Sequence, residues 1–221
     1  LQWQGWADTL DICAGRGINR QIERAYGVLA SRYRPGDRIV LVGFSRGAYA
    51  VRSLAGVIDM VGLVGADDAT VRTIRQAYRH YRSGVRGPVA EAFRRRYCID
   101  RVQIDAVAVW DTVKSLGLQS PVRPAREVTG HRFHNHALGP AIRHVFHALA
   151  LDETREAYHP VLWHCPPERL GQVEQVWFRG SHGDVGGQLA GHLASRPLSN
   201  IPLVWMLERL EACGLTLPTG W

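Results

Sequence analysis

A serine in the first quarter of the chain has neighbours that suit nucleophilic catalysis. Residues 43–47 read G-F-S-R-G, a G-x-S-x-G pattern centred on Ser45. The pattern follows a short apolar run and precedes a helical periodicity, which is the context in which a nucleophile elbow exposes its serine. Gly43 and Gly47 stand two residues before and two residues after Ser45. We expect that a larger side chain at either position would collide with the strand and the helix. The sequence predicts Ser45 as a nucleophile and the backbone N–H of Arg46 as an oxyanion donor.

A serine hydroxyl needs a base to take its proton, and the base needs an acid to orient it. The acid is expected at the carboxyl end of a strand, where the sites of open α/β sheets form. Asp111 closes the apolar run 106–110 and meets this condition, whereas Asp105 begins the same run and belongs at the opposite edge. Asp152 is the alternative acid, ranked second because it follows a segment that is interpreted as helix.

His182 is the preferred base among ten histidines. It comes shortly after the apolar run 173–178, and glycines on both sides predict a loop that carries it over the sheet edge toward Ser45. Five other histidines lie in or near residues 131–147, with HxxH spacing at 131/134 and at 144/147. Neither pair is part of a HExxH motif, so we expect structural histidines there and neither a metal site nor a cofactor.

The elements that must position these residues alternate between helix and strand. Apolar residues at helical spacing predict a helix over 19–33, capped by Asn19, and another over 46–61. Short apolar runs predict buried parallel strands at 38–44 and 105–110, and a third, partly alternating run predicts a strand at 173–178. We further expect helices over 141–151 and 199–213, the latter ended by Gly214. This order predicts an α/β sandwich with a mainly parallel sheet in a single domain over residues 1–221.

Composition excludes several classes of protein. The chain has 221 residues, of which 46% are hydrophobic and 21% are charged, as in a soluble globular protein. No apolar run is long enough for a transmembrane helix. The four cysteines are widely spaced and predict free thiols in a reducing compartment rather than a disulfide framework. We expect a protein that is cytoplasmic, or exported without a recognisable signal peptide.

The net charge of +7 has a local source. Nine arginines lie between residues 72 and 101, against Glu91 and Asp100. Seven of the nine fall in two expected helices, over 68–83 and 88–97. A solvated helix face is the first interpretation of this segment. The alternative is a surface for phosphate groups, with Arg72, Arg75 and Arg79 as candidates for contact with substrate or a membrane surface. No nucleic-acid-binding signature accompanies it, so we expect no nucleic-acid partner. These helices and an irregular excursion over 115–140 are the candidates for a lid.

Several ordered motifs give the sequence a specific resemblance. They read GFSRGAYAVRSLAGVI, VAVWDTVKSLG, HALALDETREAYHPVLW, FRGSHGDVGG and LSNIPLVWML. With them, residues 15–213 resemble the uncharacterised bacterial α/β-hydrolase-domain family that includes phospholipase effectors of type VI secretion systems. The resemblance implies a serine hydrolase of ester bonds, most familiarly lipid esters, with Ser45 as nucleophile, Asp111 as acid and His182 as base. His147 and Asp152 match a further family motif.

The sequence also departs from the family pattern. Members usually open with a strand that ends in Asp-Gly-Thr, and this sequence begins at Leu1 in what resembles the following loop. We therefore expect a truncated N-terminal side, and the turn 15–17 (G-R-G) is a hypothetical replacement for the second oxyanion donor. A further, small departure is Gln188, which stands where a third glycine is common after Asp184.

The sequence thus predicts a serine esterase or lipase of the phospholipase kind, which forms an acyl-enzyme and needs no cofactor. Its expected partner is an ester or phospholipid substrate, with transient contact at a membrane surface. One alternative is a non-catalytic or incomplete hydrolase-fold module that binds anionic partners through its basic face. Another keeps the triad but transfers the acyl group to an acceptor other than water.

Overall fold

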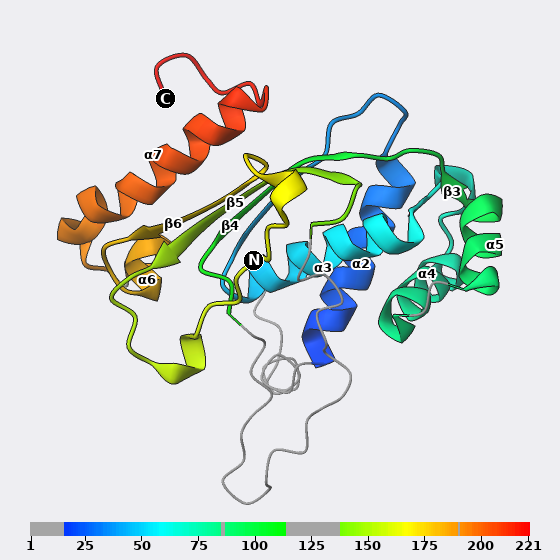
Figure 1. Cartoon of the computed structure of the whole chain (residues 1–221), viewed down its shortest axis with the longest axis horizontal. Helices are drawn as coiled ribbons and strands as arrows, with labels where there is room; N and C mark the ends of the chain where they lie inside the picture. Colours follow the sequence, from blue (N-terminus) through cyan, green and yellow to red (C-terminus); the bar gives the residue numbers. More distant parts are fainter. Residues whose placement is uncertain (1–15, 85–86, 114–137, 190) are drawn as a thin grey trace, which may run out of the picture. The chain divides into compact units, whose positions relative to one another are not determined.

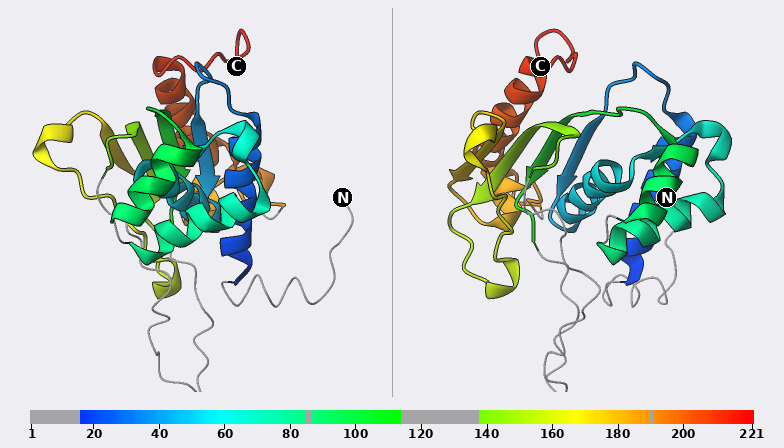
Figure 2. Two further views of the ribbon diagram at one scale, coloured as in Figure 1. Left: turned by 90° about the vertical axis from the view of Figure 1, so that its right-hand side faces the viewer. Right: turned by 45° about the vertical axis from the view of Figure 1, so that its right-hand side comes forward.

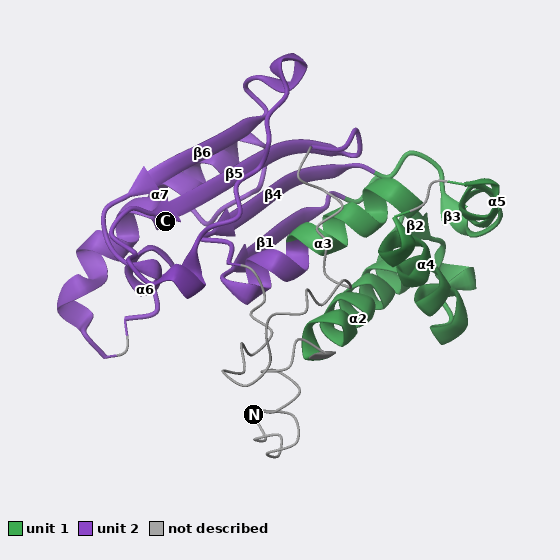
Figure 3. Cartoon of the chain, turned by 60° about the horizontal axis from the view of Figure 1, so that its bottom comes forward, with its two compact units in different colours: residues 1–37, 52–102, 115–135 green, residues 38–51, 103–114, 136–221 purple. Residues whose placement is uncertain are grey.

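The structure is a computed structural model that describes residues 16–84, 87–113, 138–189 and 191–221. The chain divides into two compact units, which Figure 3 shows in separate colours. The first unit takes its residues from 1–37, 52–102 and 115–135, and the second from 38–51, 103–114 and 136–221. Most of the excursion predicted over 115–140 lies outside the described residues.

A parallel sheet is the main element of the second unit. Its strands are β1 (Val40–Phe44), β4 (Ile104–Trp110), β5 (Ile142–Ala150) and β6 (Val173–Phe178). They lie in the order β1-β4-β5-β6, and each neighbouring pair is parallel (Figure 3). The register aligns Phe44 with Trp110 and Trp110 with Ala148. The residues that follow these strands therefore meet at one edge of the sheet, and the predicted α/β class with a mainly parallel sheet is confirmed.

The strands predicted at 38–44, 105–110 and 173–178 are confirmed as β1, β4 and β6, but the helix predicted over 141–151 is wrong. Those residues form β5, which pairs with β4 on one side and β6 on the other. Residues 145–150 are buried without interruption, so the polar alternation that marks a half-exposed strand is missing. An apolar run of this kind does not distinguish a central parallel strand from a buried helix.

Two helices of the second unit pack with this sheet. The short helix α6 (His182–Val185) follows β6, and α7 (Arg196–Ala212) runs along one face of the sheet in Figures 1 and 2. Their shared core joins alanines of β4 and β5 and Phe146 to Val185, Met206 and Leu210. The predicted helix over 199–213 is confirmed as α7, which begins three residues earlier and ends before Gly214, a residue with a φ of 85°.

The helix α3 (Arg46–Val61) begins directly after Ser45 and confirms the helix predicted over 46–61. Its first turns belong to the second unit and the rest to the first unit. Residues 53–59 are buried throughout, and the stripe formed by Leu54, Val57 and Ile58 is almost fully covered. The apolar stripe that the sequence periodicity predicts is therefore buried, and so are the residues beside it.

The first unit contains α2 (Arg16–Arg32), α4 (Val71–Ser83), α5 (Pro88–Tyr97) and the short antiparallel pair β2 (Leu63–Val64) and β3 (Cys98–Ile99). The buried Tyr26 connects α2 to β2, because its hydroxyl donates to Gly62 O at 2.8 Å and accepts from Val64 N at 3.1 Å. Asn19 is not the helix cap that the sequence predicted. It lies inside α2, and its Oδ1 accepts a hydrogen bond of 2.7 Å from the Tyr78 hydroxyl.

The two arginine-rich helices predicted over 68–83 and 88–97 are confirmed as α4 and α5. Gly84 ends α4 with a φ of 65°, and Pro88 begins α5, where a missing N–H costs nothing. Single 3-10 turns occupy Ala66–Asp68, Glu156–Tyr158, Pro167–Arg169 and Leu193–Ser195. Among the helices that the structure describes, none combines the length and the apolar character needed to cross a membrane.

Candidate active site

Ser45 lies in a sharp turn between β1 and α3. Its φ of 57° is unusual for a residue other than glycine, and its backbone N–H donates to Trp110 O at 3.0 Å. A Cβ at Gly43 would lie 2.6 Å from Gly47 O, so only glycine fits there. A Cβ at Gly47 would meet no described atom within 4 Å, so the predicted collision is confirmed at Gly43 and wrong at Gly47. The turn holds Ser45 half-buried at the sheet edge.

Asp111 follows β4 directly and is 1% exposed. Its Oδ1 accepts a hydrogen bond of 3.1 Å from Ala150 N, at the end of β5, and its Oδ2 lies 2.7 Å from His182 Nδ1. Its φ of 41° is also in the left-handed region, where a non-glycine residue stores strain. Asp105, at the other end of β4, instead accepts from Ile39 N at 3.1 Å.

His182 joins the serine to the acid. Its Nε2 lies 2.8 Å from Ser45 Oγ, so the three side chains form one hydrogen-bonded line. The residue is 4% exposed and is the first residue of α6, not a member of the glycine loop that the sequence predicted. Ser181 and Asp184 close this helix N-terminus in a capping box. The structure thus brings together the three residues that the sequence singled out.

The alternative acid, Asp152, does not contact His182. Its Oδ2 accepts from Gly180 N at 2.7 Å, and its own N–H donates to Gly180 O at 3.1 Å. Asp152 follows a strand rather than a helix, so the reason for ranking it second is wrong. What distinguishes Asp152 from Asp111 is its hydrogen-bond partner. The Asp152 carboxylate binds the backbone of Gly180, two residues before His182, and not the imidazole.

His147, which matches the same family motif as Asp152, is fully buried in β5. Its Nε2 accepts a hydrogen bond of 3.1 Å from the backbone N–H of Thr112, the residue after Asp111. His144 lies three positions earlier on the same strand, so the two side chains point to opposite faces of the sheet and the 144/147 pair is not a metal site. The 131/134 pair lies outside the described residues. Among the residues that the structure describes, no three His, Cys, Asp or Glu side chains are grouped as metal ligands.

Aromatic and charged side chains that the sequence did not single out surround His182. The ring of Phe44 lies 4.6 Å from the imidazole and that of Tyr158 lies 4.7 Å from it, between ring centroids. Glu153 Oε2 accepts from His182 N at 3.2 Å. Hydrogen bonds from Arg155 are the main cause that lowers the pKa of Glu153 to about 2. For Glu153 and Tyr158, the signal in the sequence is their position just after residues 142–150, which form a strand where a helix was predicted.

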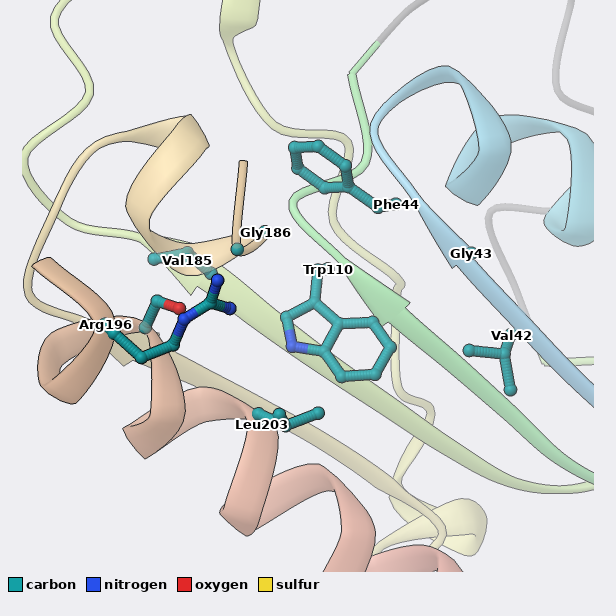
Figure 4. A pocket seen from close by; sticks show the side chains of 10 residues that line it. Val42, Gly43, Phe44, Trp110, Val185, Gly186, Arg196 and Leu203 are labelled. Atoms are coloured by element: carbon teal, nitrogen blue, oxygen red, sulfur yellow. The ribbon is translucent and has the colours of Figure 1, made fainter. Parts of the chain in front are cut away.

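A cavity of about 250 Å³ lies in the second unit beside Phe44 (Figure 4). Its wall is mainly apolar, and Arg196 extends from the start of α7 toward Gly186 and Trp110. Gly186 is required there, because a Cβ at this position would overlap the Phe44 ring. Such a lining suits a hydrocarbon chain. The residues of the wall are Val42, Gly43, Phe44, Trp110, Val185, Gly186, Gly187, Arg196, Ser199 and Leu203.

The remaining predicted site residues have separate places. Arg46 is the first residue of α3, where a backbone N–H has no acceptor within its own helix. Arg72, Arg75 and Arg79 are exposed on α4, in the first unit. The sequence suggested a turn over 15–17 as the second oxyanion donor. Arg16 and Gly17 lie in α2 rather than in a turn, and residue 15 lies outside the described residues.

Comparison with known proteins assigns the chain to a family. Residues 2–209 match the family described as the catalytic domain of Tle1-like phospholipase effectors of the type VI secretion system. The chain is also similar to the uncharacterized protein YEL023C of Saccharomyces cerevisiae, with 30% identity over 156 residues. That alignment covers 66% of this chain and 21% of the yeast protein, so the chain spans about a fifth of the relative it matches. No solved structure matches the chain.

Proposed function

Because the chain belongs to the family of Tle1-like phospholipase effector catalytic domains of type VI secretion, we propose that it hydrolyses carboxylic ester bonds of phospholipids with Ser45, Asp111 and His182 as its catalytic triad. The family supplies the lipid substrate class. The observation that carries the residue assignment is the hydrogen-bonded line of 2.8 Å from Ser45 to His182 and 2.7 Å from His182 to Asp111.

This line suits acyl transfer through an acyl-enzyme. His182 Nε2 accepts the Ser45 Oγ proton as Oγ attacks the ester carbonyl, and the imidazolium is stabilised by the ionised Asp111. The carbonyl C–O bond to the alcohol then breaks, and His182 returns the proton to the leaving alkoxide. Water, deprotonated by His182, attacks the acyl-Ser45 ester and releases the carboxylic acid and the free serine. Asp111 keeps its charge throughout.

The backbone N–H of Arg46 is the proposed oxyanion donor. It lies at the start of a helix of 16 residues, where the free N–H groups and the helix dipole favour negative charge. Ser45 directly precedes Arg46 and has the strained backbone of a sharp turn, as the serine of a nucleophile elbow has in α/β-hydrolases. This turn and the parallel sheet support an α/β-hydrolase type of fold.

Two further features support a lipid substrate. The cavity beside Phe44, the residue that precedes the nucleophile, has a mainly apolar wall suited to an acyl chain. In the first unit, α4 has no acidic residue, and Arg72, Arg75 and Arg79 share one exposed face. We propose that these arginines make transient contact with an anionic membrane surface.

The experiment that tests the triad is labelling with a fluorophosphonate, which reacts covalently with activated serines. We expect labelling of the wild-type protein and none of Ser45→Ala. The matched control is Ser31→Ala, which removes an exposed hydroxyl of α2 and leaves the triad intact. Labelling that persists in Ser45→Ala would refute the nucleophile, and an unlabelled wild-type protein would favour the non-catalytic alternative.

A further inference from the structure

The surroundings of His182 contain a closed ring of contacts that the triad mechanism does not use. The ring runs from His182 to Glu153, from Glu153 to Arg155, from Arg155 to Tyr158, and from Tyr158 back to His182. We propose that Glu153 and Tyr158 are positioning residues that hold the His182 imidazole for proton transfer, with Arg155 as the link between them. This inference rests on the proposed function of the triad.

The first contact fixes the backbone of His182. Glu153 Oε2 accepts the His182 N–H at 3.2 Å, and the Glu153 side chain is only 6% exposed. This N–H belongs to the first residue of α6, so it has no acceptor within its own helix. The carboxylate therefore satisfies a donor that the helix itself leaves without an acceptor.

The second contact fixes the carboxylate. Arg155 binds Glu153 with two guanidinium hydrogen bonds, from Nε to Oε1 at 2.8 Å and from Nη2 to Oε2 at 2.7 Å. The backbone N–H of Arg155 adds a third bond to Oε1, at 2.9 Å. A bidentate arginine–carboxylate pair is directional, so it holds both partners in one orientation.

The third and fourth contacts return to the imidazole. The Arg155 guanidinium carbon lies 3.9 Å from the centroid of the Tyr158 ring, a cation–π distance. The Tyr158 ring meets His182 in an edge-on arrangement with an interplanar angle of 61° and a centroid distance of 4.7 Å. Phe44 contacts the same imidazole at 4.6 Å and 32°. His182 is thus packed by one ring that the elbow supplies and one that the 153–158 segment supplies.

The reaction gives such packing a purpose. While Ser45 is acylated, the hydroxyl proton that it shares with His182 is gone, and the imidazole keeps only its hydrogen bond to Asp111. One hydrogen bond leaves the imidazole free to tilt about that bond. The helix that carries His182 has four residues, so its own backbone bonds restrain the residue weakly. Contacts with Tyr158 and Glu153 keep Nε2 directed first at Ser45 Oγ, whose proton it takes during attack, and then at the position where water must lose its proton.

The test compares rates of fluorophosphonate labelling as a function of probe concentration in the intact protein. We expect Tyr158→Ala to lower the maximal labelling rate by roughly 10-fold to 100-fold, the size of effect that a misplaced catalytic group produces. The probe concentration for half-maximal rate should change little, because Tyr158 is assigned no contact with the substrate. Tyr158→Phe keeps the ring and should label at the wild-type rate, a rescue that distinguishes ring packing from a role of the hydroxyl.

A second comparison uses a matched set of side chains elsewhere in the same unit. Glu174 accepts a hydrogen bond of 2.8 Å from Arg209, whose guanidinium carbon lies 5.6 Å from the centroid of Trp205. Glu153→Gln should slow labelling, whereas Glu174→Gln breaks the same kind of pair and should not. Because Glu153 and Tyr158 act through one ring, the double variant Glu153→Gln/Tyr158→Ala should lose less than the product of the two single losses.

An NMR measurement supplies a readout besides labelling. The Nδ1 proton of His182, which Asp111 holds, should give a low-field resonance that is sharp in the wild-type protein and broadened in Tyr158→Ala. If Tyr158→Ala does not fold, Tyr158→Leu and Glu153→Gln carry the same test. Wild-type rates in folded Tyr158→Ala, with Ser45→Ala unlabelled, would overturn this inference and leave the triad standing. An unlabelled wild-type protein would overturn the proposed function and the inference with it.

Discussion

At the scale of single residues, two acids compete for the role of orienting His182, and their contacts separate them. Asp111 is buried and hydrogen-bonded to the imidazole, whereas Asp152 is bound to the backbone of Gly180 and lies 3.4 Å from the Arg179 guanidinium. An acid that holds the imidazole must be ionised and must meet Nδ1–H. Among the described residues, Asp111 is the acid whose carboxyl oxygen meets His182 Nδ1, at 2.7 Å.

We therefore expect Asp111→Asn to reduce the maximal rate of ester hydrolysis by about 10⁴-fold, because an amide can favour the wrong imidazole tautomer. Asp152→Asn keeps an acceptor oxygen for Gly180 and should cost far less. Steady-state hydrolysis of a short-chain phospholipid by both variants measures the difference. Equal losses in the two variants would show that the triad acid is assigned wrongly.

At the scale of the element, the segment after β5 provides a charged support for α6. The hydrogen bonds of Arg155 lower the pKa of Glu153 from 4.5 to about 2, with the His182 N–H a smaller cause in the same direction. A carboxyl group whose pKa is lower in the folded state stabilises the protein fully above its unfolded pKa. That stabilisation is lost as the pH falls toward the folded value.

This sign predicts the pH dependence of the variant Glu153→Gln. The difference between its free energy of unfolding and that of the wild-type protein should be constant above pH 4.5, and it should shrink as the pH falls from 4.5 toward about 2. Urea unfolding at a series of pH values measures it. A difference that stays constant down to about pH 2 would show that Glu153 gains no charge-dependent stability from folding.

At the scale of the whole molecule, the three residues of the proposed triad belong to the second unit and the basic face of α4 belongs to the first. A phospholipase acts on molecules that are assembled in a membrane. Arginine near an anionic surface contributes about 1 kcal/mol per residue, and this contribution falls as salt screens it. On the membrane contact proposed above, three such residues together contribute about 3 kcal/mol to binding at low salt.

We expect replacement of Arg72, Arg75 and Arg79 by Gln to weaken binding to vesicles that contain phosphatidylglycerol by roughly 100-fold at low salt. Binding to vesicles of phosphatidylcholine alone should stay weak in both proteins. Vesicle co-sedimentation measures this in the Ser45→Ala background, so that no lipid is consumed. Replacement of Arg24, Arg32 and Arg34 by Gln, which makes the same charge change elsewhere in the unit, is the control. Equal losses in the two triple variants would point to net charge rather than to the α4 face.

The local elements and the turn that carries Ser45 can be predicted from the sequence alone. Gly43 and Ser45 are readable from sequence because the close approach of the elbow to its helix excludes a Cβ at Gly43, a constraint that acts within five residues. The same holds for the strand that ends at Trp110 and for the two arginine-rich helices, whose periodicity and end residues are local. The choice of Asp111 followed from the general rule that parallel strands bring their carboxyl ends together.

Features that depend on pairing between distant segments become visible in the folded structure and not in the sequence. Residues 142–150 form a strand because β4 and β6 hydrogen-bond to both of their edges, and neither partner is visible in the run itself. That pairing places Glu153 beside the His182 N–H and brings Tyr158 against the imidazole. Along the chain, Glu153 and Tyr158 lie 29 and 24 residues before His182. Local patterns carry no signal for such contacts, because side chains meet across the sheet edge only after the strand register has been set.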